Sequence, residues 1–286
     1  MLPTLSRFTA APLLTAFFEE KSTVARASLD LGRTTASVEL SEEGALLFSD
    51  EPPVPWATIR EILEGEKGCF TVQPDGSAAP IRAFSASTKR YYALCATETG
   101  PPTMLVSGIP MHRIKNTDPG KDTAAKLTAL GRVGTHALDT ATGLGYTAIG
   151  LAERGAQVTT IELDPAAQEI CRANPWSQGL FADARIVQKM GDSAEVVQEF
   201  DSERFSAILH DPPTLSLGGQ LYSGAFYRQL FRVLRRGGRL FHYIGDPNSR
   251  TGSSTTAGVR RRLQEAGFSK VAPAPEAFGL TAERSR

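Results

Sequence analysis

The sequence is poor in cysteine and has no excess charge of either sign. Its 286 residues include three cysteines, with no Cys-x-x-Cys pair and no Cys/His cluster. These absences predict neither a zinc site nor a disulfide framework, and they favour a reducing, cytoplasmic setting. Lysine plus arginine and aspartate plus glutamate both number 31, so the formal net charge is zero. A global positive field that holds nucleic acid is therefore not indicated, although a local basic face remains compatible with this composition.

Long hydrophobic runs are also missing. The apolar stretch at residues 13–18 follows Pro12 and runs directly into Glu19, Glu20 and Lys21. This pattern favours an amphipathic helix over a signal peptide. No run approaches the roughly 18 apolar residues of a membrane-spanning helix, so no membrane partner is predicted.

The first third of the chain mixes strand and helix patterns. Residues 28–40 alternate apolar and polar side chains, and residues 56–63 carry Trp56, Ile59 and Ile62 at helical spacing. Further strands are expected at residues 44–48, 68–72, 91–96 and 103–107. We therefore predict a small α+β domain over residues 1–110 that helps to capture the substrate.

After residue 118 the chain alternates strands and helices. Asp122 and Thr123 are expected to cap a helix that runs to Leu130, and a buried strand ends at Asp139. Alternating segments of this length predict an α/β domain over residues 111–286, with a parallel sheet covered on both faces. The two final strands have only a turn between them, so the last strand should be antiparallel. The later strands are expected at residues 157–163, 184–189, 205–210, 239–244, 269–274 and 278–284, and the helices at 147–154, from 165, after 192, at 224–234 and at 257–266.

A glycine-punctuated loop follows the first of these strands. Gly143 and Gly145 let the backbone approach a ligand closely, since no Cβ intervenes. The spacing Gly143-x-Gly145-x-x-Ala148 also satisfies a dinucleotide-binding pattern. However, Asp139 at the mouth of the loop would repel a pyrophosphate and attract the cationic sulfonium and ammonium groups of S-adenosylmethionine. We therefore favour the sulfonium ligand.

Two further acids follow later strands. Glu162 lies at the end of the second strand, where its carboxylate could accept both hydroxyls of a ribose. Asp192 lies at the end of the third strand, where it could accept a hydrogen bond from an adenine amino group. Asp192 and Ser193 are equally good N-caps for the following helix, so a purely structural role stays open for both.

These motifs resemble those of class I S-adenosylmethionine-dependent methyltransferases. The resemblance is carried by Asp139-x-x-x-Gly143-x-Gly145, by Glu162, by the pair Gly191-Asp192 and by residues 210–213, His-Asp-Pro-Pro. Residues 138–149 are most similar to a family of predicted archaeal-type methyltransferases with the Asp-Pro-Pro motif. Residues 111–113, 174–177, 221–224 and 240–243 strengthen that match. The resemblance implies a seven-stranded Rossmann-like sheet. It also implies a cofactor site made of Asp139, Thr140, Ala141, Gly143, Gly145, Glu162, Leu163, Asp192, Ser193 and Asp211.

The Asp-Pro-Pro segment is the expected catalytic element. The Asp211 carboxylate and the Pro212 carbonyl could orient an amine and accept its proton, while the two prolines fix the loop. Similar segments usually carry an aromatic residue in the fourth position, where this chain has Thr214. Tyr222, Phe226 or Tyr227 could supply a stacking face instead. Alternatively, Asp211 could only hold its own loop in place.

Residues before the sheet complete the predicted substrate side. His112 and Arg113 are expected to contact the substrate together with Thr214, Tyr222 and Tyr227. His210 and His242 lie beside strand ends, where a histidine is more often structural.

The sequence predicts methyl transfer to nitrogen on RNA or on a small amine. An aminopropyltransferase resembling spermidine synthases, and a non-catalytic cofactor-binding partner protein, are the alternatives. The acceptor atom and the oligomeric state are left open.

Overall fold

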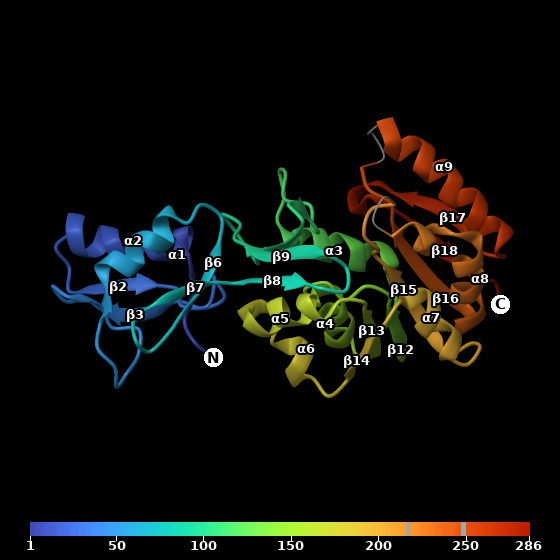
Figure 1. Cartoon of the computed structure of the whole chain (residues 1–286). Coiled ribbons are helices and arrows are strands. Elements are labelled where there is room, and N and C mark those ends of the chain that lie inside the picture. Colours follow the sequence, from blue (N-terminus) through green and yellow to red (C-terminus); the bar gives the residue numbers. More distant parts are fainter. Residues whose placement is uncertain (216–217, 247–249) are drawn as a thin grey trace. The chain divides into compact units, whose positions relative to one another are not determined.

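The computed structural model describes residues 1–215, 218–246 and 250–286, with only the backbone for residues 250–254 (Figure 1). The chain forms two compact units. The first comprises Met1–Gly120 and Ala166–Gln178, and the second comprises Lys121–Pro165 and Gly179–Arg286. The domain boundary after residue 110 stays a prediction.

The first unit is built from small antiparallel sheets. Its core gathers apolar side chains from the first 78 residues, among them Leu5, Leu13, Ile59 and Val72. One sheet has the strand order β1-β6-β7 and another the order β11-β10-β9-β8, while β2 pairs with β3 and β4 with β5. The strands are β1 (Thr4–Ser6), β2 (Val24–Ala27), β3 (Ala36–Glu39), β4 (Gly44–Ala45), β5 (Val54–Pro55), β6 (Cys69–Val72), β7 (Ala78–Pro80), β8 (Arg82–Ser85), β9 (Arg90–Cys95), β10 (Thr103–Val106) and β11 (Ile109–Pro110).

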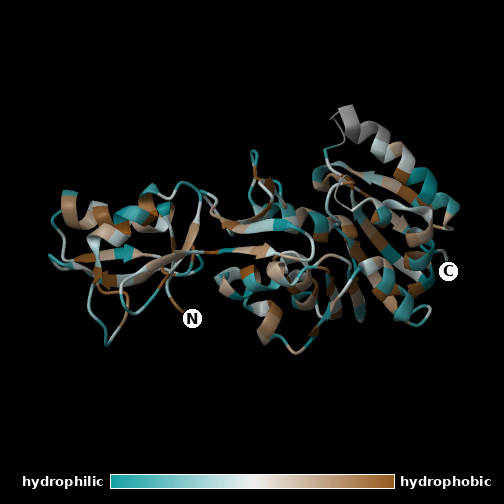
Figure 2. Ribbon diagram, in the orientation of Figure 1, coloured by the Kyte–Doolittle hydropathy of each residue, from teal (hydrophilic) through white to brown (hydrophobic). Residues whose placement is uncertain are grey.

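The helices of the first unit follow the amphipathic pattern of the sequence. In α2 (Trp56–Glu64) the buried residues are Trp56, Ile59 and Ile62, and Figure 2 shows hydrophobic and hydrophilic colours side by side on α1 and α2. Pro12 does not end the first helix but lies inside α1 (Arg7–Leu14), which continues as a π-helix, η1 (Thr15–Glu19). The unit also includes α5 (Pro165–Ala173) and the short helix η2 (Pro175–Ser177), apart from Pro165 itself.

The second unit contains a seven-stranded sheet with the order β14-β13-β12-β15-β16-β18-β17. Strand β12 pairs in parallel with β13 and β15, whereas β18 runs antiparallel to β16 and β17. The α/β fold class and the antiparallel last strand are thus confirmed. The strands are β12 (His136–Asp139), β13 (Gln157–Glu162), β14 (Ile186–Met190), β15 (Phe205–His210), β16 (Leu234–Tyr243), β17 (Ser269–Ala274) and β18 (Gly279–Glu283).

A large apolar cluster forms the core of this unit. It joins strand residues such as Leu138, Ile208 and Leu240 to Leu230 of α8 and Leu263 of α9. Burial of this area supplies the main driving force for folding of the unit. The helices are α3 (Pro119–Leu130), α4 (Tyr146–Glu153), α6 (Gly179–Ala182), α7 (Ser193–Val196), η3 (Val197–Glu199), η4 (Gly219–Tyr222), α8 (Gly224–Val233), α9 (Arg250–Glu265) and η5 (Pro275–Ala277).

Several element boundaries differ from the predicted ones. Helix α3 begins at Pro119, so Asp122 and Thr123 lie inside it rather than capping it. Proline at the first turn is favourable because its missing N–H would have no partner there. Strand β16 begins at Leu234, well before the predicted residue 239, and includes Gly237 and Gly238. Helix α9 begins before the predicted residue 257, and the strand expected at residues 44–48 is reduced to Gly44–Ala45.

Candidate functional site

Two acidic residues lie at the point where the strand order of the sheet reverses. From β12 the chain builds outward through β13 and β14, and β15 then pairs on the other side of β12. Asp139 is the last residue of β12, and Asp211 directly follows β15. In open α/β sheets, ligands bind outside the carboxyl ends of the strands at this switch point. The sheet topology therefore brings the two acids to the expected ligand site.

Asp139 is fully buried, and its two carboxylate oxygens differ in their hydrogen bonds. Its Oδ2 accepts hydrogen bonds from the hydroxyls of Thr147 and Thr160, both at 3.1 Å. Among the described residues, no group donates a hydrogen bond to Oδ1. Desolvation by burial raises the pKa of Asp139 to about 7, against the opposing effect of the two threonines. A buried acceptor atom without a donor fits the ammonium or sulfonium group of a ligand.

The glycines of the loop have two different roles. Gly143 adopts φ +51° and a Cβ built on it would meet nothing within 4 Å, so open space lies above this residue. Gly145 adopts φ +77° at the N-cap of α4, and a Cβ there would lie 2.9 Å from Cδ2 of Leu180. Gly143 therefore leaves room at the loop, whereas Gly145 is required for the packing of the loop on α6.

Glu162 is held against this loop by backbone groups. Its two carboxylate oxygens accept hydrogen bonds from the N–H of Gly143 and of Asp164, each at 3.0 Å. Desolvation raises the pKa of Glu162 to about 7, although these hydrogen bonds lower it. Each carboxylate oxygen can accept a further hydrogen bond, as binding to ribose hydroxyls would require. Leu163, which follows, is half exposed.

Asp192 and Ser193 both have structural partners. Asp192 caps α7 by accepting a hydrogen bond from the N–H of Ala194 at 2.8 Å, and its other oxygen accepts one from Nε2 of Gln220 at 2.6 Å. The hydroxyl of Ser193 donates to the carbonyl of Thr140 at 2.5 Å. No sequence pattern pointed to Gln220, because it lies 28 residues from Asp192.

Thr140 and Ala141 connect β12 to the glycine loop. The buried hydroxyl of Thr140 lies 2.6 Å from Nδ1 of His210, and Nε2 of His210 lies 3.0 Å from the carbonyl of Leu221. His210 must donate from Nε2 to that carbonyl, so its Nδ1 accepts from Thr140. Burial lowers the pKa of His210 to about 3. The side chain of Thr140 is thus used within the protein, while Ala141 remains partly exposed.

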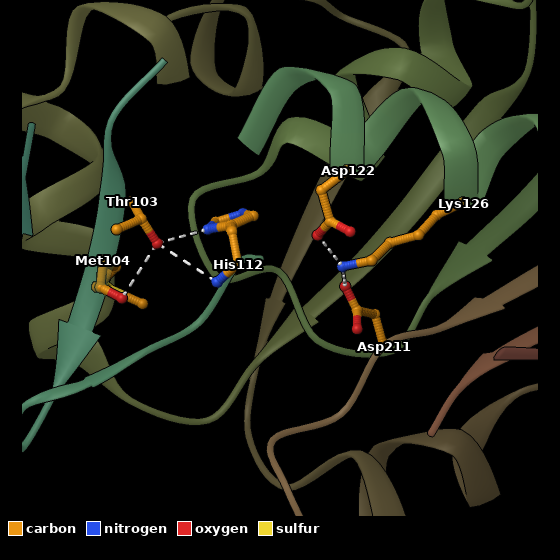
Figure 3. A network of polar contacts seen from close by, with 6 residues as sticks. All are labelled: Thr103, Met104, His112, Asp122, Lys126 and Asp211. Carbon is orange, nitrogen blue, oxygen red and sulfur yellow. Dashed lines mark hydrogen bonds and ion pairs between the residues drawn. The ribbon is translucent and has the colours of Figure 1, made fainter. Parts of the chain in front are cut away.

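Asp211 forms an ion pair with a buried lysine that the sequence analysis did not identify (Figure 3). Nζ of Lys126 lies 2.6 Å from Oδ2 of Asp211 and 2.8 Å from Oδ2 of Asp122. It also lies 4.6 Å from the centre of the Tyr243 ring. Lys126 is 1% exposed, and although desolvation lowers its pKa, the two carboxylates outweigh this and raise it above the ordinary value. The spacing of Asp122 and Lys126 on one helix was visible in the sequence, but such a pair usually indicates a solvated face.

The loop after Asp211 is held by Tyr222. This tyrosine is buried in η4, and its hydroxyl donates to the carbonyl of Pro213 at 3.1 Å. Pro212 is buried, whereas Thr214 is exposed. Tyr222 therefore fixes the Asp-Pro-Pro loop directly.

Tyr227 does not offer a ring face to a substrate in this structure. It is fully buried in α8, and its hydroxyl hydrogen-bonds to Nε2 of His242 at 2.9 Å. His242 is also buried, its ring centre lies 4.3 Å from that of His210, and burial lowers its pKa. The two histidines and Tyr227 are therefore core residues.

His112 and Arg113 belong to the first unit. Nδ1 of His112 lies 3.0 Å from the hydroxyl of Thr103 on β10, and the same hydroxyl accepts from the N–H of His112 at 3.3 Å (Figure 3). This pairing fixes the turn after β11. The first unit also contains the motif at residues 174–177, where Nε1 of Trp176 donates to the carbonyl of Leu31 at 2.9 Å.

The described parts of the chain hold no cluster of three or more histidine, cysteine or acidic side chains suited to a metal ion. Within the same residues, no helix is long and apolar enough to cross a membrane.

The comparisons with known proteins show a methyltransferase domain in this part of the chain. Residues 138–242 match the family model described as a methyltransferase domain. The chain is 38% identical over 264 residues to the uncharacterized protein MJ1233 of Methanocaldococcus jannaschii, covering 91% of this chain and 89% of that protein. It is 40% identical over 89 residues to a tRNA1(Val) (adenine(37)-N6)-methyltransferase of Porphyromonas gingivalis, covering 30% of this chain and 34% of that enzyme.

The fold is also shared with solved structures. A spermidine synthase in complex with a transition-state analogue, AdoDATO, aligns with a TM-score of 0.57 and 17% identity over 68% of this chain and 71% of the other. At this identity the similarity concerns the fold alone.

The cofactor is S-adenosylmethionine, and the described residues fit it: the acceptor atom of Asp139, the space above Gly143 and the carboxylate of Glu162 lie around one loop. The chain belongs to the same family as MJ1233, and it carries a class I S-adenosylmethionine-dependent methyltransferase domain.

Proposed function

We propose that this chain methylates an amino nitrogen, and that an exocyclic amine of an RNA base is the acceptor. The observation that carries the proposal is the Asp-Pro-Pro loop at the switch point, with its carboxylate paired to a buried lysine. The relative from Porphyromonas gingivalis, which by its name methylates N6 of an adenine in tRNA, supports RNA. A small amine is the second acceptor class.

The residues of the loop suit the positioning of an amine. When bound, S-adenosylmethionine supplies an electrophilic methyl group on a sulfonium. The Asp211 carboxylate and the Pro212 carbonyl would accept the two N–H bonds of the acceptor and direct its lone pair toward that methyl group. Correct alignment alone can contribute much of the rate of such a displacement. Tyr222 holds the loop in place through the Pro213 carbonyl.

Lys126 forms an ion pair with Asp211, and a nearby cation favours the ionised carboxylate, which is the form that can accept a proton. No strong base is required here, because the N–CH₃ bond forms as the S–CH₃ bond breaks and the cationic nitrogen of a methylated base then loses its proton readily. Asp211 would receive that proton and pass it to solvent.

The test is transfer of radiolabelled methyl groups into RNA, protein and small-molecule fractions of a cell extract. We expect label in RNA, a loss of at least about 100-fold in Asp211→Asn, and an unchanged rise in melting temperature when this variant binds the cofactor. Full activity of Asp211→Asn would show that Asp211 has no catalytic role.

The same assay addresses the alternatives. Label only in the small-molecule fraction would identify a small amine as the acceptor. Aminopropyl transfer to a polyamine from decarboxylated S-adenosylmethionine, without methyl transfer, would identify an aminopropyltransferase. Cofactor binding without any transfer would support a non-catalytic role.

A further inference from the structure

The sheet β11-β10-β9-β8 of the first unit carries an exposed aromatic pair. Phe84 on β8 and Tyr91 on β9 are register partners, with ring centres 4.7 Å apart and ring planes tilted by 48°. Phe84 is 50% exposed and Tyr91 66% exposed. Monomeric proteins leave a single large apolar side chain exposed quite often, but an adjacent aromatic pair on one face of a sheet is less easily explained by chance.

The two faces of this sheet differ in the way that strand alternation requires. Tyr92, Leu94, Met104 and Val106 point to one face and are at most 6% exposed. The opposite face carries the aromatic pair and a second row of register partners, which runs across the strands as Arg82, Ala93, Leu105 and Pro110. The sheet therefore has an ordinary buried side and an open side with two rings and an arginine; we call this open side the aromatic face.

Basic side chains lie beside the aromatic face. Arg82 lies two residues before Phe84 on the same side of β8, and Lys89 lies in the turn between β8 and β9. Arg90 is the first residue of β9 and shares the side of Tyr92. Residues 76–117 contain five lysines and arginines (Arg82, Lys89, Arg90, Arg113 and Lys115) and a single acidic residue, Glu98. In a chain whose net charge is zero, this segment is a local basic region.

We propose that the aromatic face binds single-stranded RNA, with bases stacked on Phe84 and Tyr91 and phosphates contacted by Arg82 and Lys89. Exposed aromatic rings on an open sheet stack on unpaired bases, and flanking cations neutralise the backbone. This inference rests on the proposed function and deepens it, since it narrows the substrate to RNA with unpaired bases. The role proposed for the first unit is then the capture of that strand.

The experiment measures binding without catalysis. A fluorescein-labelled single-stranded RNA of mixed sequence, about 12 nucleotides long, is titrated with the full chain in the absence of cofactor, and its anisotropy gives Kd. Phe84→Ala/Tyr91→Ala should weaken binding at least about tenfold. Phe8→Ala is the matched control, because Phe8 is 37% exposed in the same unit but lies on α1; it should leave Kd unchanged.

Two further variants separate stacking and charge from simple hydrophobic contact. Tyr91→Phe should bind as the parent chain does, and Tyr91→Leu should not, because stacking requires the ring but not the hydroxyl. Arg82→Gln/Lys89→Gln should reduce the slope of log Kd against log salt by about 1.4, that is, about 0.7 per phosphate contact. Arg260→Gln/Arg261→Gln removes two exposed charges from α9 and should leave the slope unchanged.

Several results would overturn the inference. They are an unchanged Kd in the double alanine variant, no binding of the RNA by the parent chain, or tighter binding of a duplex of the same sequence. A fourth is a change in oligomeric mass of the double alanine variant without a change in RNA affinity, which would make the aromatic face a contact between copies of the chain.

The outcome is separable from that of the proposed function. If RNA binds through the aromatic face but receives no methyl group, the inference about the aromatic face is supported and the proposal that RNA is the methyl acceptor is wrong. If RNA is methylated equally by the parent chain and the double alanine variant, the function stands and the inference about the face is wrong.

Discussion

At the scale of single residues, the site depends on carboxyl groups that are expensive to ionise. Asp139 and Glu162 both have a pKa raised to about 7 by desolvation. In the ligand-free protein both groups therefore change charge near neutral pH. Below that pH the carboxyl groups are neutral and cannot attract a cationic ligand.

We expect the affinity for S-adenosylmethionine to fall as the pH is lowered from 8 to 6. Asp139→Asn should bind more weakly at pH 8 and should show a smaller pH dependence, since it keeps the shape of the side chain without its charge. Calorimetric titration at the two pH values measures both effects. An Asn variant with the pH dependence of the parent chain would contradict the role of Asp139.

The raised pKa of Asp139 should also make folding stability depend on pH. The pKa of Asp139 in the folded chain lies above its ordinary value of 3.8, so the folded state holds the proton more tightly than the unfolded state. The free energy of unfolding must then decrease as the pH rises through the interval from 3.8 to about 7. Above this interval, Asp139→Asn should stabilise the ligand-free chain by about 1–3 kcal/mol, whereas at pH 4 it should not. Urea unfolding at both pH values provides the measurement.

Lys126 is a buried charged side chain, and its removal should lower folding stability. Lys126→Met leaves Asp122 and Asp211 together without their cation, and removing one partner of a buried pair typically costs about 3–5 kcal/mol. Lys189→Met is the matched control, because the pair of Lys189 with Glu199 is exposed and such pairs contribute about 0–1 kcal/mol. Equal urea stabilities of the two variants would show that the Lys126 network contributes little.

At the scale of elements, the two glycines of the loop should respond differently to mutation. Gly145 is needed for packing, and Gly143 leaves space for the ligand. Alanine at either Gly143 or Gly145 must adopt a positive φ, which costs about 1–2 kcal/mol. Gly145→Ala also places a Cβ 2.9 Å from Leu180, so we expect a larger loss of stability. Gly143→Ala should instead lose cofactor affinity, because its Cβ enters the open space of the loop.

Melting temperature and cofactor Kd distinguish these effects. Leu180→Ala alone should also lose stability, because Leu180 is buried. The double variant Gly145→Ala/Leu180→Ala should lose less stability than the sum of the two single variants, since the smaller side chain removes the clash. If Gly143→Ala bound the cofactor as the parent chain does, the space above Gly143 would not be part of the ligand site.

At the scale of the whole molecule, cofactor binding should stabilise the folded chain by mass action. At about 100 times Kd, S-adenosylmethionine or its demethylated product adds about 2.7 kcal/mol to the free energy of unfolding. For a domain of this size the melting temperature should rise by roughly 5–10 °C. NAD should produce no rise, because its pyrophosphate would meet the carboxylate of Asp139. Equal stabilisation by NAD in differential scanning fluorimetry would contradict the cofactor assignment.

Much of the second unit was predictable because its signals are local. The predicted strand at residues 205–210 coincides with β15, and the antiparallel last strand follows from the short connection before it. The positions of Asp139, Glu162 and Asp211 at strand ends follow from the same apolar runs. The boundary of β16 was wrong because pairing with β15 extended the strand to Leu234. The boundary of α3 was wrong for a local reason, because Pro119 is favourable at the first turn of a helix.

The amino-acid sequence by itself determined the strand–helix order, the glycine loop and the acids at the strand ends, because these depend on neighbours a few residues away. The tertiary structure alone decided which partners those acids have. Lys126 meets Asp211 across 85 residues of sequence, Gln220 meets Asp192 across 28, and Tyr227 lies in the core instead of facing a substrate. Burial and pairing of charges depend on which distant segments pack together, and no local pattern of residues contains that information.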